Sequence, residues 1–131
     1  MRVILDTNVF VGAGFNRGSA SARLLEAARE GRLTIVWSDA TRRETRAVLT
    51  RIPRLKWEDV EALFRDEGRV EAEVWPDADF VTDPQDRKFA ALSMGAGVPV
   101  VSSDDDLLSH SDRLDVVKPS EFLRQVEIPA D

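Results

Sequence analysis

Short apolar runs recur along the chain and mark its predicted strands. Val3–Leu5 is too short and too continuously apolar for a surface helix, so it predicts a strand buried on both faces. The same pattern returns at Leu33–Trp37 and Val98–Val101, each after a glycine-containing break, as expected where a helix ends before a strand. Val116–Val117 is a shorter fourth candidate.

Helical periodicity fills the stretches around these strands. Helices are predicted over residues 19–30, 38–51, 57–67, 84–95 and 119–126. Alternation of this kind is typical of βαβ crossovers, so we expect an α/β fold with a mostly parallel sheet and helices on both faces. The 131 residues are close to the usual size of one domain and contain no repeat or Gly/Ser-rich linker, which predicts a single domain over 1–131.

Composition narrows the chemistry to carboxylates. The net charge of −6 argues against nucleic-acid binding by overall charge, so any polyanion site must be local. The absence of cysteine excludes thiolate nucleophiles and zinc sites with sulfur ligands, and His110 is the only histidine. The apolar run at the amino terminus is too short for a signal peptide or a membrane span, so we expect a cytoplasmic protein with no membrane contact.

Acidic side chains follow two of the predicted strands. Asp6 comes directly after the first strand, and Asp104 lies three residues beyond Val101. Ligands of open parallel sheets bind outside the carboxyl ends of the strands, where the strand order reverses. The sequence therefore predicts two carboxylates at one edge of the sheet.

Two further acids are placed near this edge by helix geometry. Glu44 falls on the apolar side of its helix, and Asp86, in the first turn of another, is in register with residues that lean toward the sheet. Four carboxylates this close cannot all stay ionised unless a cation neutralises them or some take up protons. Oxygen ligands without His or Cys select Mg²⁺ or Mn²⁺.

Four motifs, in this order, resemble the PIN-domain family of metal-dependent ribonucleases over nearly the whole chain. V-I-L-D-T-N-V matches the first acid of the family at Asp6, and Glu44 matches the second. D-P-Q-D-R-K-F-A-A-L matches the third at Asp86, and V-V-S-S-D-D-D-L-L matches the fourth at Asp104, with a further acid at Asp106. Supporting positions of the family are matched by Thr7, Asn8 and Ser102.

The resemblance implies a three-layer α/β/α sandwich, a Mg²⁺ or Mn²⁺ site, cleavage of RNA and frequent homodimers. The chain is also similar to the VapC-like toxins of toxin-antitoxin pairs, which would add a cognate antitoxin as a partner. PIN domains also serve in RNA processing and DNA repair, so the resemblance leaves toxin status open.

Structural interpretations stand beside these functional ones. Asp6 and Asn8 could shape a turn, and Asp106 could cap a short helix at Leu107-Leu108. Asp83 is expected as an N-cap, with Pro84 at the first helical position. We expect His110 to be exposed without a role. The three tryptophans are expected in the core or an interface: Trp37, Trp57 and Trp75.

A basic run shares the helix of Glu44. Residues 42–56 contain six basic side chains and one acid, and Arg42, Arg43 and Arg46 point away from Glu44. They could form a solvated helix face or guide RNA phosphates. Residues 70–86 show the reverse balance, with six acids and no base, which could meet a basic partner.

Three functions compete at this point. The first is a ribonuclease that uses one or two metal ions to activate water, without a covalent nucleophile. The second is an aspartate-nucleophile phosphatase, which the asparagine at position 8 argues against because the D-x-D motif needs an acid there. The third is a catalytically silent PIN-like module that binds RNA or protein, which the presence of all four acids disfavours. A phosphorylated receiver domain would need an adjacent acid pair, which Asp6-Thr7 does not supply.

Overall fold

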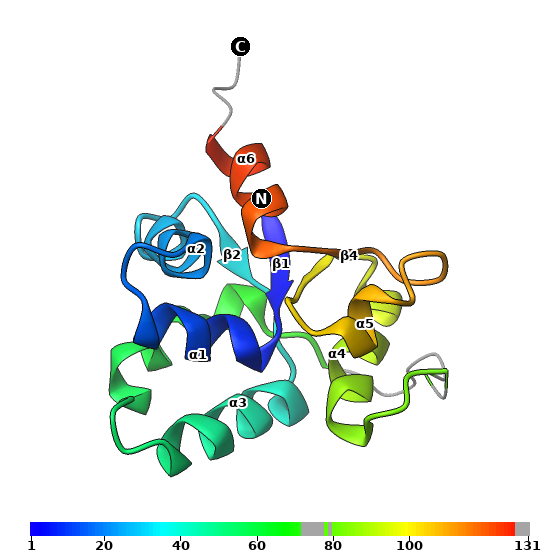
Figure 1. The fold of residues 1–131 in the computed structure, drawn as a ribbon, viewed down its shortest axis with the longest axis horizontal. Helices are drawn as coiled ribbons and strands as arrows, with labels where there is room; N and C mark the ends of the chain where they lie inside the picture. Colours follow the sequence, from blue (N-terminus) through cyan, green and yellow to red (C-terminus); the bar gives the residue numbers. More distant parts are fainter. Residues whose placement is uncertain (72–77, 79, 128–131) are drawn as a thin grey trace.

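The residues that the structure describes are built on a sheet of four parallel strands (Figure 1). The computed structural model describes residues 1–71, 78 and 80–127. The strands are β1 (Arg2–Leu5), β2 (Thr34–Ile35), β3 (Val100–Val101) and β4 (Val116–Val117), in the order β2-β1-β3-β4. All four predicted strands are present, although β2 and β3 are shorter than their apolar runs because only two residues of each pair with a neighbour in the ladder.

In the part of the chain that the structure describes, six α-helices surround this sheet. They are α1 (Thr7–Phe15), α2 (Ala20–Arg29), α3 (Asp39–Arg51), α4 (Pro84–Ala96), α5 (Asp105–Leu108) and α6 (Pro119–Glu127). Side-chain caps fix several starts: Ser19 accepts from the Ala22 amide, and Ser38 forms a reciprocal capping box with Thr41. Four of the five predicted helices are thus confirmed to within a few residues.

Two local predictions were wrong. The segment expected as a helix over 57–67 forms three 3₁₀ turns instead: Trp57–Asp59, Glu61–Leu63 and Asp66–Gly68. Its buried side chains, Trp57, Val60 and Leu63, recur every third residue, a spacing that suits 3₁₀ turns. Helix α1 was not expected, because its sequence combines β-branched residues with two glycines, both poor helix formers. Tertiary packing of Val9 and Phe10 holds it in place.

The alternation of β1 divides the core into two layers. Val3 and Leu5 pack in one cluster with residues of α1, α2 and α6, whereas Ile4 packs in the other with residues of α4 and Leu107 of α5. A strand sends successive side chains to opposite faces, so helices cover both faces of the sheet. The expected three-layer α/β/α arrangement is confirmed.

The strand order reverses beside β1. From β1 the chain pairs first with β2 on one side, and later with β3 on the other. The carboxyl ends of β1 and β3 therefore flank the crevice where ligands bind in open parallel sheets. Among the described residues, no helix is long and apolar enough to cross a membrane.

Candidate metal centre

Three of the predicted acids meet at this edge of the sheet. Asp6 follows β1 and is the N-cap of α1, Asp104 follows β3 and is the N-cap of α5, and Asp86 lies in the first turn of α4. Each offers a carboxylate oxygen, and these oxygens all lie within 4.8 Å of one another. The positive N-terminal ends of α1 and α4 offset part of this negative charge.

Ser102 holds two of these acids in place. Its fully buried hydroxyl donates a 2.8 Å hydrogen bond to Asp6 Oδ2 and accepts one of 2.9 Å from the backbone amide of Asp104. The carboxylate of Asp104 accepts from the amide of Asp106 at 3.0 Å. The supporting role expected of Ser102 therefore has a geometric basis: it connects the ends of β1 and β3.

Asp86 is the least satisfied member of the group. Its side chain is 7% exposed, and among the described residues its Oδ2 has no hydrogen-bond partner. A buried carboxylate oxygen without a donor is costly unless the group is protonated or a cation binds it. This oxygen is therefore available either to a proton or to a bound cation.

The same conditions raise the pKa of two of the acids. Burial raises the pKa of Asp6 from 3.8 to about 6, although the hydrogen bond from Ser102 lowers it. The pKa of Asp86 rises from 3.8 to about 8, first because of burial and then because of the negative charges of Asp6 and Asp104. Near neutral pH Asp86 therefore tends to keep its proton, and a divalent cation would favour the ionised form of the cluster instead.

The donor set fits a hard divalent ion. All three groups are carboxylates, two of them nearly buried, and one oxygen lacks a donor. Hard oxygen ligands of this kind suit Mg²⁺ and Mn²⁺. Asp6, Asp86 and Asp104 could hold such an ion.

Glu44 lies at the same cavity but outside this group. The cavity measures about 180 Å³, and ten residues line it: Asp6, Thr7, Asn8, Glu44, Val48, Asp83, Gln85, Asp86, Phe89 and Asp104. Glu44 is buried, as its position on the helix predicted, and its Oε2 accepts a 3.3 Å hydrogen bond from Lys88 Nζ of α4. Sequence analysis missed Lys88, because only the packing of α3 against α4 brings these two positions together.

Asp106 also lies outside the group of three. Its Oδ2 accepts a 3.0 Å hydrogen bond from the amide of Asp83, which ties α5 to the start of α4. The proposed capping role of Asp106 was wrong, because Asp104 is the N-cap of α5. The N-cap at Asp83 and the proline at the first helical position of α4 are confirmed.

The buried threonine after Asp6 packs against α3. Thr7 Oγ1 lies 3.0 Å from Thr45 Oγ1, one residue beyond Glu44, so this contact fixes α1 against the helix that carries Glu44. Asn8 is exposed at the cavity. Thr45 was not expected as a supporting residue, since nothing in the sequence separates it from other buried helical positions.

The three arginines of the predicted RNA-binding face differ in their surroundings. The guanidinium of Arg42 lies 5.1 Å from the ring centre of Trp57 and 6.0 Å from that of Trp37. Arg43 and Arg46 are exposed. Only these two are therefore fully available to solvent.

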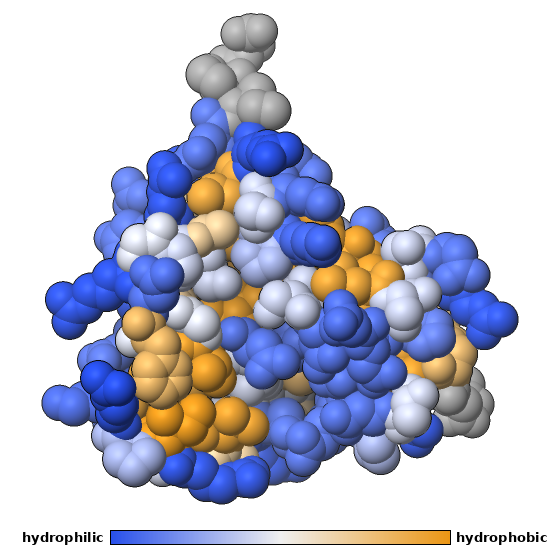
Figure 2. Space-filling view, viewed as in Figure 1, coloured by the Kyte–Doolittle hydropathy of each residue, from blue (hydrophilic) through white to orange (hydrophobic). Residues whose placement is uncertain are grey.

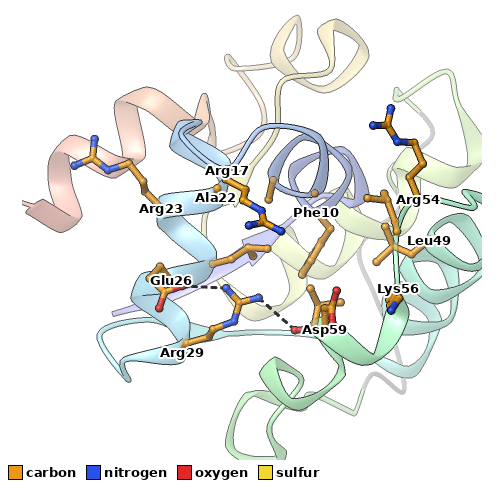
Figure 3. A pocket seen from close by; sticks show the side chains of 15 residues that line it. Phe10, Arg17, Ala22, Arg23, Glu26, Arg29, Leu49, Arg54, Lys56 and Asp59 are labelled. Carbon is orange, nitrogen blue, oxygen red and sulfur yellow. Dashed lines mark hydrogen bonds and ion pairs between the residues drawn. The ribbon is translucent and has the colours of Figure 1, made fainter.

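A second, larger cavity of about 670 Å³ lies between α1, α2 and the segment after α3 (Figure 3). Its floor includes Phe10 and Leu49, and its basic lining residues are Arg17, Arg23, Arg29, Arg54 and Lys56. Arg29 bonds Glu26 and the carbonyl of Asp59. Figure 2 shows mostly hydrophilic side chains on this view of the molecule, with one apolar patch over α1 and α3 and another near β4 and α5.

The remaining sequence expectations have mixed outcomes. Trp37 and Trp57 are buried in the core as expected, and Trp75 lies outside the described residues. His110 is half-buried rather than exposed, because its ring packs edge-on against Phe80 at 5.1 Å. The acidic stretch 70–86 falls partly outside the described residues.

Fold and site together define an α/β domain with a carboxylate cluster of the kind that binds divalent metal. The family model of the PIN domain matches residues 2–120, so the chain belongs to the PIN-domain family. Membership in this family indicates a nuclease, a hydrolase that acts on nucleic acid with divalent metal ions. Neither a curated protein nor a solved structure matched the chain.

Proposed function

We propose that this protein is a Mg²⁺- or Mn²⁺-dependent endoribonuclease that hydrolyses RNA phosphodiester bonds. The observation that carries the proposal is the group of three carboxylates within 4.8 Å, together with the partnerless Oδ2 of Asp86. A silent binding module would have no need for a buried, unsatisfied acid here, since such a group lowers stability. An aspartate-nucleophile phosphatase is disfavoured by Asn8.

Asp6, Asp86 and Asp104 are the residues proposed to hold the ion. A bound Mg²⁺ or Mn²⁺ would lower the pKa of a coordinated water and stabilise charge on the phosphate. The chain's contribution is to keep the three carboxylates in place: Ser102 orients Asp6, and the amide of Asp106 orients Asp104. Glu44, which lines the same cavity, is proposed as the fourth acid of the active site. Asp106 is proposed to support the three acids from outside the group, since its amide bonds Asp104.

Hydrolysis through water predicts defined RNA ends. The sequence has no cysteine, and the half-buried ring of His110 packs against Phe80, so we propose no covalent nucleophile among the described residues. Attack by water on the phosphorus, with departure of the 3′ oxygen, leaves a 5′-phosphate and a 3′-hydroxyl. RNA is proposed to approach over the exposed basic face of α3, Arg43 and Arg46, with Arg42 beside them.

The biological setting proposed here is that of a toxin in a toxin-antitoxin pair, acting in the cytoplasm as a homodimer and held by a cognate antitoxin. The support for this is the similarity of its motifs to VapC-like toxins. A neighbouring gene for a small partner protein would strengthen the proposal, and purification of the chain with such a partner would test it.

Cleavage of a mixed RNA pool tests the proposed activity. The purified protein is incubated with the pool in Mg²⁺, Mn²⁺ or EDTA, and cut positions and end chemistry are determined by sequencing. We expect cuts in both metals, none in EDTA, and 5′-phosphate ends. Cuts that persist in EDTA, or that leave 2′,3′-cyclic phosphates, would argue against metal-activated water.

A further inference from the structure

The pairing of Glu44 with Lys88 separates the fourth acid from the other three. Lys88 Nζ donates to Glu44 Oε2 at 3.3 Å and links α4 to α3. The Glu44 side chain is 11% exposed, whereas that of Lys88 is 41% exposed. Within the described part of the chain, Lys88 is the hydrogen-bond partner of the Glu44 carboxylate. A half-exposed lysine therefore binds a nearly buried acid that lines the cavity.

The charged side chains at the cavity divide into two sets, a cluster of three acids and the Glu44–Lys88 pair. Asp6, Asp86 and Asp104 form one cluster, which suits a single divalent ion. In two-metal sites the ions lie about 3.5–4 Å apart, and a further acid on the cavity wall would serve the second ion. In this protein that acid is Glu44, and it is already paired with the ammonium group of Lys88.

A lysine can also perform part of the second ion's task. Its ammonium is a compact point charge with three donors, and it binds phosphate readily. Glu44, the partner of Lys88, lines the same cavity as the three acids, so the ammonium lies beside the wall of the space that a phosphate bound at these acids would enter. The Lys88 side chain is 41% exposed, which leaves it accessible to a substrate phosphate.

We propose that Lys88 takes the place of a second divalent ion, neutralising Glu44 and contacting the phosphate of the RNA substrate. The inference rests on the proposed ribonuclease function for its substrate. The number of metal ions that the inference predicts for the protein does not depend on RNA, because that number is argued from the contacts of the described residues.

Counting Mn²⁺ ions tests the first half of this inference. Metal-free protein is titrated with Mn²⁺ by isothermal calorimetry in the absence of RNA. We expect one ion per wild-type chain and one in Lys88→Arg, which keeps the charge. Lys88→Met should bind a second, weaker ion, because it frees the Glu44 carboxylate, and Lys88→Met combined with Glu44→Gln should return to one.

Two results would overturn this half. One is a wild-type chain that binds two Mn²⁺ ions, and the other is a folded Lys88→Met variant that binds one ion like the wild type. Circular dichroism establishes that the variants fold. If Lys88→Met alone fails to fold, the wild-type count and the double variant still decide, since a double variant that binds two ions would contradict a second site built on Glu44.

Salt-dependent RNA binding tests the phosphate contact. Binding of a short single-stranded RNA is measured in EDTA, where metal-dependent hydrolysis does not occur. Loss of one phosphate contact makes the negative slope of log K against log salt shallower by about 0.7. Lys88→Met should show this change, and Lys88→Arg should not. An unchanged slope in Lys88→Met would show that Lys88 does not meet the substrate.

The two proposals fail in distinguishable ways. If the Mn²⁺ counts are as expected but no RNA is cleaved, the ribonuclease function is contradicted, whereas the pairing of Lys88 with Glu44 in place of a second ion is still supported. Metal-dependent RNA cleavage with two ions in the wild type would contradict only the role of Lys88.

Discussion

Replacing Asp86 by asparagine should stabilise the metal-free protein. The substitution keeps the shape of the side chain but removes a negative charge that faces Asp6 and Asp104. Its amide also supplies donors at a site where the carboxylate Oδ2 has no partner among the described residues. The variant therefore removes the cause of the raised pKa and should relieve the folded state.

The magnitude follows from that pKa. One pKa unit corresponds to about 1.4 kcal/mol, so a pKa of 3.8 in the unfolded chain and about 8 in the folded one corresponds to about 6 kcal/mol at high pH. The titration is shared with Asp6 and Asp104, and water screens part of the charge in the open cavity. We therefore expect a gain of about 2–3 kcal/mol in the free energy of unfolding.

The gain should depend on pH in a definite direction. An acid whose folded pKa lies above its unfolded pKa binds more protons when folded, so its stabilising contribution is complete below pH 3.8 and is lost as the pH rises through about 8. The wild type should lose this contribution over that range, and Asp86→Asn should not. The difference between the two proteins should therefore grow from pH 5 to pH 8.5.

Urea unfolding in EDTA measures this difference. Fluorescence reports the transition, because Trp37 and Trp57 are buried. Asp112→Asn, at an exposed position, is the matched control for the loss of one acid and should change little at either pH. The reasoning is refuted if Asp86→Asn is no more stable than the wild type at pH 8.5, or if its advantage is the same at pH 5.

Three further predictions follow from the same contacts. Millimolar Mg²⁺ or Mn²⁺ should raise the Tm of the wild type, with Mn²⁺ effective at lower concentration, and should leave Asp86→Asn nearly unchanged; a wild-type melting curve indifferent to Mn²⁺ would contradict the metal centre. Ser102→Ala should lower the free energy of unfolding by about 1–2 kcal/mol in urea titrations and weaken Mn²⁺ binding, because Asp6 loses its buried hydroxyl donor. Unchanged Mn²⁺ affinity would show that Ser102 does not position Asp6. The double variant Arg43→Ala/Arg46→Ala should make the salt dependence of RNA binding shallower by about 1.4, and the Tm shift in Mn²⁺ should stay as in the wild type. An unchanged salt dependence would mean that RNA binds elsewhere, for instance over the larger cavity at Arg17 and Arg54.

The sheet and three of its acids could be predicted because they depend on local pattern. Strands buried on both faces appear as continuous apolar runs, and the end of such a run gives the position of Asp6 directly. Asp86 follows from the Asp-Pro start of α4, and Asp104 from its place after β3. Parallel strands bring their carboxyl ends to one edge, so these positions converge without further information.

The contacts that depend on packing could not be predicted. Glu44 and Lys88 are 44 residues apart, and only the approach of α3 to α4 pairs them. The bond between the Asp106 carboxylate and the amide of Asp83 depends in the same way on the packing of α5 against the start of α4. Helix α1 forms against its own weak propensity because Val9 and Phe10 are buried beneath the sheet.

Cleavage of RNA by the wild type and by Asp6→Asn, both with saturating Mg²⁺ or Mn²⁺, tests the central claim most directly. Asp6 is 2% exposed, and its Oδ2 accepts from Ser102, so the substitution changes charge at the cluster with little change of shape. The account predicts metal-dependent cleavage by the wild type and its loss in the variant, with the fold retained by circular dichroism. Cleavage by Asp6→Asn at the wild-type rate would contradict it.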